Sequence, residues 1–145
     1  MKTDTWDTLW AVDFGTSPQI RQFDAQWNLV TTVGFANPFA TGTGGATLPG
    51  DFVPYNIMTL GSRVFVTYAK SSVDNGTIPT SFLASTEDAM DAATEKTSGF
   101  TPNRGRLVEY SLTGVLVRTY QDGQHLNAPW GVAIAPASEL QPRQP

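Results

Sequence analysis

The chain has 145 residues, a formal net charge of −4, a charged fraction of 15% and no cysteine. This length predicts one domain with a sizeable core, and the lack of cysteine excludes disulfides and thiolate chemistry. The nine lysine and arginine residues are scattered, which argues against nucleic-acid binding, and no apolar run reaches the roughly 20 residues of a membrane helix.

Short runs of β-forming residues, separated by turn residues, dominate the chain from residue 9 onward. The runs are rich in β-branched and aromatic side chains, and the 13 glycines and 10 prolines supply turns between them. The pattern predicts eight strands, over residues 9–14, 19–24, 29–34, 55–60, 63–69, 106–111, 115–120 and 129–135.

Residues 80–104 interrupt this pattern. Ser85 followed by Asp88 resembles a capping box, and Ala89 and Met90 favour helix. We therefore expect a helical insertion with a short helix at about 86–96, which ends near Gly99. The acidic residues at 87, 91 and 95 share one helix face, and a solvated face is a better interpretation than a metal site.

The strands also repeat. The segment "LWAVDFG" from Leu9 aligns with "VFVTYAK" from Val64, "IRQFDAQWNLVTT" with "LVEYSLTGVLVRT", and "PYNIMTL" with "PWGVAIA". A repeating unit of four antiparallel strands, A to D, is typical of a β-propeller blade. The sequence thus predicts an all-β propeller segment over 1–145 with two blades' worth of four-stranded sheet. Its parts are strands B, C and D of a first blade (9–34), strands A to D of a second (54–120, with the insertion 80–104), and a further strand A (129–135).

Several segments carry a resemblance to a known family, namely "VPYNIMTLGSRVFVTYAK", "GRLVEYSLTGVLVR", "LNAPWGVAIAP" and the "GF" at 34–35. They resemble a family of uncharacterised, mostly bacterial NHL-repeat-like proteins, which are similar to six-bladed propellers. The resemblance spans about residues 9–136; it implies a longer chain than this one, without the insertion, and a protein that is often exported. The first ten residues, "MKTDTWDTLW", lack the apolar region of a signal peptide, so the location stays open.

The strand order, B-C-D then A-B-C-D then A, suggests assembly with other copies. In a propeller the last strand A would belong to the next blade, so we expect it to add to strand B of another copy in a head-to-tail ring. Six blades give a trimer, which the family resemblance favours, while four or eight blades would give a dimer or a tetramer. The alternative is that the chain is a fragment of a longer protein.

Propeller ligands bind at the channel mouth, where loops and the ends of strands A converge. The candidate channel-lining or ligand-lining residues are Tyr55, Asn56, Tyr68, His125, Asn127 and Trp130. Three copies of Asn56 or Asn127 around one axis would give oxygen ligands for water or for a divalent cation such as Ca²⁺. The interpretation we prefer is that these asparagines cap turns through bonds to the backbone, because no carboxylate accompanies them.

No catalytic residue and no metal ligand is assigned from the sequence. His125 is the only histidine, and nothing pairs it with a nucleophile. We expect a non-catalytic propeller that acts as a binding and assembly module, with itself as partner and an unknown ligand. The alternative is a metal-dependent hydrolase or lactonase of the six-bladed type, which would need an Asp or Glu in the channel beside Asn56 or Asn127.

Overall fold

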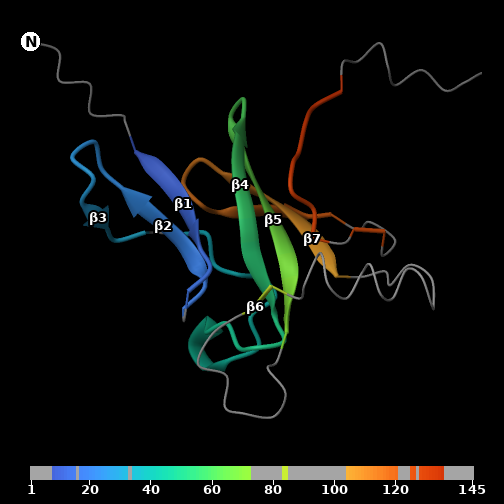
Figure 1. Ribbon diagram of the computed structural model, residues 1–145. Helices are drawn as coiled ribbons and strands as arrows, with labels where there is room; N and C mark the ends of the chain where they lie inside the picture. The colour runs from blue at the N-terminus through green and yellow to red at the C-terminus, as the bar shows by residue number, and fades with distance from the viewer. Residues whose placement is uncertain are drawn as a thin grey trace, which may run out of the picture.

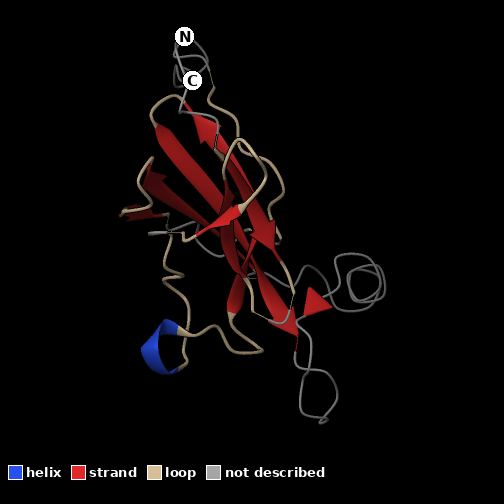
Figure 2. Cartoon of the chain, turned by 90° about the vertical axis from the view of Figure 1, so that its left-hand side faces the viewer, coloured by secondary structure: helices blue, strands red, loops and turns tan. Residues whose placement is uncertain are grey.

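The structure is a computed structural model of the whole chain, and it describes residues 8–15, 17–32, 34–72, 83–84, 104–120, 125–126 and 128–135 (Figure 1). These residues form two antiparallel sheets joined by a long loop. Figure 2 shows the short 3-10 turn Thr43–Gly45 on that loop, away from the strands. None of the described residues belongs to a helix long and apolar enough to span a membrane.

The first sheet contains β1 (Leu9–Asp13), β2 (Gln19–Phe23) and β3 (Leu29–Val30), in that order. The turn between β2 and β3 is closed by Asp24, whose Oδ1 accepts the backbone N–H groups of Gln26 and Asn28 at 2.9 Å. A short polar side chain that bonds its own backbone in this way favours a turn over a continued strand.

The second sheet contains β4 (Phe52–Leu60), β5 (Arg63–Ser72), β7 (Gly105–Ser111) and β8 (Leu116–Thr119), in that order, and the short β6 (Leu83–Ala84) pairs with the end of β5. Between β4 and β5 lie only Gly61 and Ser62, and Gly61 has a φ of 61°. A two-residue hairpin needs positive φ in its loop, which glycine adopts without strain.

The prediction of an all-β chain with two antiparallel sheets is confirmed, and the two sheets contain three strands and a path of four. Neither sheet closes on itself in the described residues, so the propeller and its oligomerisation stay proposals. The predicted helix at 86–96 lies outside the described residues, as does most of the insertion 80–104.

Three strands differ from the prediction by three residues or more, and one of them is β5, which continues to Ser72 where the prediction ended at 69. The third strand of the chain was expected over 29–34 but only Leu29 and Val30 pair, because the chain turns away at Gly34, whose φ is 89°. The fourth begins three residues earlier than expected, at Phe52, which pairs with Lys70. Pro54 is tolerated inside β4 because this strand is at the sheet edge, and the register shifts between Pro54 and Asn56.

The strand predicted over 129–135 is not formed within the described chain. Trp130 and Val132 instead lie over a face of the second sheet, where they line a small cavity together with Met58, Phe65 and Thr67. A segment that lies on a face gains side-chain contacts but no ladder of backbone hydrogen bonds, so alternating apolar residues alone do not make it a strand. Its pairing with another copy stays a proposal.

The core lies between the two sheets. One face of β5 and β7 contributes Val64, Val66, Tyr68, Val108 and Tyr110, all with no exposed surface, and Ile20 of β2 packs against them. Burial of this many apolar side chains is the main force that holds the layers together.

The loop after β3 fixes the contact between the layers. Phe35 lies in the core with its ring 5.2 Å from that of Trp10 and 5.3 Å from that of Tyr110. Its backbone N–H donates to the carbonyl of Gly114 at 2.7 Å, in the turn between β7 and β8. A Cβ on Gly34 would lie 2.6 Å from the carbonyl oxygen of Thr113, so this close approach requires glycine.

Candidate functional site

Asn56 uses its amide for the backbone. Its Nδ2 donates to the carbonyl of Trp130, and its Oδ1 accepts the N–H of Ile57 at 2.8 Å. This side chain therefore connects β4 to the segment 128–135, beside the register shift of β4. Both bonds run from side chain to backbone, as the sequence favoured, but Asn56 lies inside β4 and caps no turn.

The two candidate tyrosines lie in different surroundings. The ring of Tyr55 is 6.2 Å from that of Phe14. Tyr68 has no exposed surface, and its hydroxyl lies 2.7 Å from that of Tyr110, which donates to the carbonyl of Ala36 at 2.9 Å. Because Tyr110 donates to Ala36, Tyr68 is the donor between the two hydroxyls.

Burial raises the pKa of both core tyrosines, well above its usual value for Tyr68 and to about 12 for Tyr110. The bond that Tyr68 donates to Tyr110 also keeps the Tyr68 proton in place. Both hydroxyls are therefore protonated at neutral pH, and the structure places Tyr68 in the core and away from any ligand.

The remaining candidates lie near the end of the chain. His125 and Trp130 are exposed, the latter by 69%, and Asn127 lies outside the described residues. Asn56 and Trp130 meet on one face of the second sheet, whereas Tyr68 points into the core from the other face. The structure therefore brings two of the six candidates together and separates Tyr68 from them.

A charged network lies on the same face of the second sheet as Asn56. Glu109 is buried; its carboxylate lies 3.2 Å from Nε of Arg63 and accepts the hydroxyl of Tyr120 at 2.9 Å. Desolvation raises the pKa of Tyr120, and the bond to Glu109 raises it further. Every member has a partner within the network, as expected of a structural ion pair.

A second polar group on this face has no partner in the described chain. Thr67 is buried beneath Trp130 and Val132, and its hydroxyl makes no hydrogen bond there. A buried hydroxyl without a partner costs stability, so Thr67 is an unfavourable polar point on the face of β5 that the segment 128–135 covers.

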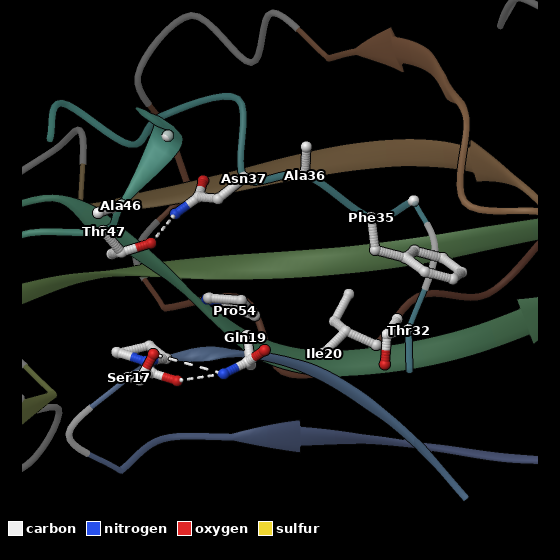
Figure 3. Close-up of a pocket in the computed structure, with 13 residues that line it drawn as sticks. Ser17, Gln19, Ile20, Thr32, Phe35, Ala36, Asn37, Ala46, Thr47 and Pro54 are labelled. Atoms are coloured by element: carbon white, nitrogen blue, oxygen red, sulfur yellow. Dashed lines mark hydrogen bonds between the residues drawn. The ribbon is translucent and has the colours of Figure 1, made fainter. Parts of the chain in front are cut away.

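A pocket of about 250 Å³ lies between β2 and the loop that joins the sheets, and we call it the interlayer pocket (Figure 3). Its base is apolar and buried, formed by Pro18, Ile20, Phe35 and Pro54. Its rim is polar and uncharged. Ser17, Gln19, Thr32, Asn37 and Thr47 contribute to this rim.

The loop on one side of the pocket is held by Asp51. Its carboxylate accepts both the N–H and the hydroxyl of Thr41, at 2.9 and 2.8 Å, and the N–H of Leu48 at 2.8 Å. Burial alone would raise the pKa of Asp51, but these bonds and the charge of Lys70 together lower it. An ionised carboxylate thus fixes the loop at neutral pH.

Asn37 fixes the same loop from the pocket side. Its Nδ2 donates to Oγ1 of Thr47 at 3.1 Å and to the carbonyl of Phe52 at 2.8 Å, and its Oδ1 accepts the N–H of Phe39 at 3.0 Å. Both N–H groups of the amide are used in this way, so Asn37 shapes the pocket and offers a ligand no donor.

Sequence reasoning did not identify the interlayer pocket. Its residues come from the turn before β2, the loop after β3, the Gly/Thr-rich loop and Pro54. The sequence showed that 37–54 is rich in glycine and threonine, but no spacing indicates that it faces residues 17–20. Across the described residues, no three His, Cys, Asp or Glu side chains gather closely enough to hold a metal ion.

Comparison with protein-family models, with curated proteins and with solved structures gave no match.

Proposed function

We propose that the chain is a non-catalytic binding and assembly module of the β-propeller type, which forms a head-to-tail ring with copies of itself, most simply a trimer. One observation carries this proposal: the segment 128–135 lies on the face of the second sheet opposite to the first sheet. The first sheet, the second sheet and this segment thus form three layers, in the same order as along the chain. Successive blades of a propeller follow each other in this way.

The position of β4 supports the same arrangement. This strand contacts β1 of the first sheet, and the two strands lie next to each other in Figure 1. Asn56 connects the same strand to the carbonyl of Trp130 on its other side. In a propeller the inner strands of neighbouring blades lie side by side around the axis. β4 is the predicted inner strand of the second blade, and β1, predicted as strand B, would be the innermost strand that this chain supplies to the first blade.

Each outer layer presents apolar side chains that another blade would cover. On the first sheet, Leu9 pairs with Phe23 and Phe23 with Leu29, so the three form a row across the face that does not contain Ile20. Leu9 is 46% and Leu29 is 55% exposed, while Ile134 on the opposite layer is 70% exposed. Contact between these surfaces in neighbouring copies would bury both.

The hydrolase alternative has no comparable support. It needs a carboxylate beside Asn56 or Asn127, and Asn56 is occupied by backbone groups at both ends of its amide. On that face of the described chain, the carboxylate of Glu109 is already paired with Arg63 and Tyr120.

The solution mass of the chain tests the proposal. Light scattering coupled to gel filtration should give about three times the chain mass of 15.7 kDa. Leu29→Glu, which places a charge in the apolar row, should shift the mass towards one chain, whereas Leu48→Glu, at an equally exposed leucine outside that row, should not. A wild-type protein that stays monomeric would refute the ring.

A further inference from the structure

The interlayer pocket contains no charged side chain among the 13 residues that line it. An ionised ligand would lose its hydration there without gaining a counter-charge, and this loss is costly. The lining therefore selects for a neutral ligand.

The pocket has the size of a single small ring. Its volume of about 250 Å³ lies just below the range of about 300 to 1,000 Å³ of pockets for drug-sized ligands. At ~30 Å³ per water molecule, it corresponds to about eight waters. A single sugar ring is of this scale, and a disaccharide or a nucleotide is larger.

Two hydrogen-bonded polar pairs flank the apolar base. In Figure 3 the pair Asn37–Thr47 and the pair Ser17–Gln19 lie on either side of Pro54. Each pair belongs to a different layer of the fold, the first to the loop that joins the sheets and the second to the start of β2.

The hydrogen bonds within these pairs determine what the rim still offers. The hydroxyl oxygens of Ser17 and Thr47 both accept an amide N–H, from Gln19 at 3.4 Å and from Asn37 at 3.1 Å. Each hydroxyl therefore keeps its own proton for donation. The Nε2 of Gln19 also donates to the carbonyl of Ser17, so its Oε1 remains an acceptor.

We infer that the interlayer pocket binds a neutral polyhydroxylated small molecule of monosaccharide size. The C–H groups of a sugar ring match the apolar base of Ile20, Phe35 and Pro54, and its hydroxyls match the donors and the acceptor on the rim. The inference gives the proposed binding module a ligand class, and it holds for a single chain whether or not the ring forms.

Methyl NMR gives a local readout of binding. The chain has four isoleucines, of which Ile20 lies in the base of the pocket and Ile134 is exposed on the opposite layer. Titration with glucose, galactose and mannose should shift the Ile20 methyl signal in a saturable way with at least one sugar, and leave that of Ile134 in place. The affinity should be the same at about 20 and 500 mM NaCl, because no charge takes part.

Charge and hydroxyl variants sharpen the test. Glucuronate, which adds a carboxylate to the same ring, should bind at least about tenfold more weakly than the best neutral sugar. Thr47→Val and Ser17→Ala, which remove one rim hydroxyl on each side, should each weaken binding by about tenfold, and Thr59→Val, at an exposed site on β4, should not.

The inference is overturned if the Ile20 methyl shows no saturable shift with any of the three sugars, if glucuronate binds equally well, or if neither rim variant weakens binding. Its failure is distinct from failure of the proposed assembly. A trimer without sugar binding refutes the pocket ligand alone, and a monomer that binds a sugar refutes the ring alone.

Discussion

The two sheets have the same antiparallel topology but very different burial. In the second sheet, Val64, Val66 and Tyr68 on one face of β5 are fully buried. On the opposite face of the same strand, Thr67 and Ala69 are buried as well. In the first sheet, Ile20 is the one residue of the described strands with less than a tenth of its surface exposed. A sheet is buried on both faces only when it has a layer on each side, and only the second sheet has two here.

Because of this difference, we expect burial in the second sheet to contribute most of the free energy of unfolding. The first sheet depends on its contact with the second. The largest test compares an aromatic residue from each. Tyr68→Ala removes a ring without exposed surface and leaves a cavity, so we expect a loss of about 4 kcal/mol in the free energy of unfolding. Phe23→Ala, on the outer face of the first sheet, should cost only about 1 kcal/mol when both substitutions are compared in a chain kept monomeric by Leu29→Glu.

Urea unfolding at a fixed chain concentration, followed by circular dichroism, measures both values. Equal losses from the two substitutions would contradict the comparison, and would mean that the outer face of the first sheet is as well covered as the core.

A second test addresses the contact that joins the two sheets. Gly114 has a φ of 75°, and a Cβ there would lie 2.7 Å from the backbone nitrogen of Phe35. Gly114→Ala should therefore cost about 3 kcal/mol, the sum of backbone strain and of displacing Phe35. Gly44→Ala has a similar φ of 68° and open space around the site, so about 1 kcal/mol is expected from strain alone. Thermal unfolding distinguishes the two, and equal melting temperatures would show that the contact between the sheets yields easily.

The tyrosine pair predicts how the core responds to alkali. The folded chain holds the Tyr110 proton up to a pKa of about 12, whereas the unfolded chain loses it near 10. This contribution is fully present below pH 10 and is lost as the pH rises from about 10 to about 12. Tyr110→Phe should cost about 1 to 2 kcal/mol at pH 7, because the Tyr68 hydroxyl loses its acceptor and the Ala36 carbonyl its donor.

The same variant should lose stability less steeply between pH 10 and 12 than the wild type, and chemical unfolding at a series of pH values records this. An unchanged slope would indicate that Tyr110 does not carry the alkaline sensitivity.

The smallest effect is expected on the outer face of the first sheet, at the ion pair between Asp13 and Arg21. The N–H of Gly15 and the guanidinium of Arg21 lower the pKa of Asp13 in spite of some burial. Its contribution is therefore present above pH 4 and lost as the pH falls through the lowered pKa. Asp13→Asn should cost about 0.5 kcal/mol at pH 7 and nothing at the acid end, and thermal melts at both values test this.

The strands of the second sheet could be predicted well from the sequence, since "RVFVTYA" and "RLVEYS" are runs of β-branched and aromatic residues bounded by turn residues. The role of Phe35 could not, because "GF" is a local motif whose partner, Gly114, is far along the chain. The segment 129–135 shows the limit of pattern reasoning. A pattern of alternating apolar residues indicates which side chains face an apolar surface. It does not distinguish a segment that packs on the face of a sheet from one that pairs at its edge.

The site was harder to predict than the fold. Tyr68 was expected close to the channel mouth, but its position on the inward face of β5 places it in the core. The interlayer pocket depends on four segments whose mutual approach is set by tertiary packing, so residues such as Ser17 and Thr47 carried no signal in a single sequence.

The backbone contact between Gly34–Phe35 and Thr113–Gly114 has a consequence for symmetry. Because no side chain separates the two chain segments there, the tilt between the two sheets is set by contacts within the chain itself. In a closed assembly that tilt is the angular step around the axis, and the step determines how many subunits complete the circle. Substitutions at these two glycines would then alter the stoichiometry of the complex, while changes on the outer faces would alter only its affinity.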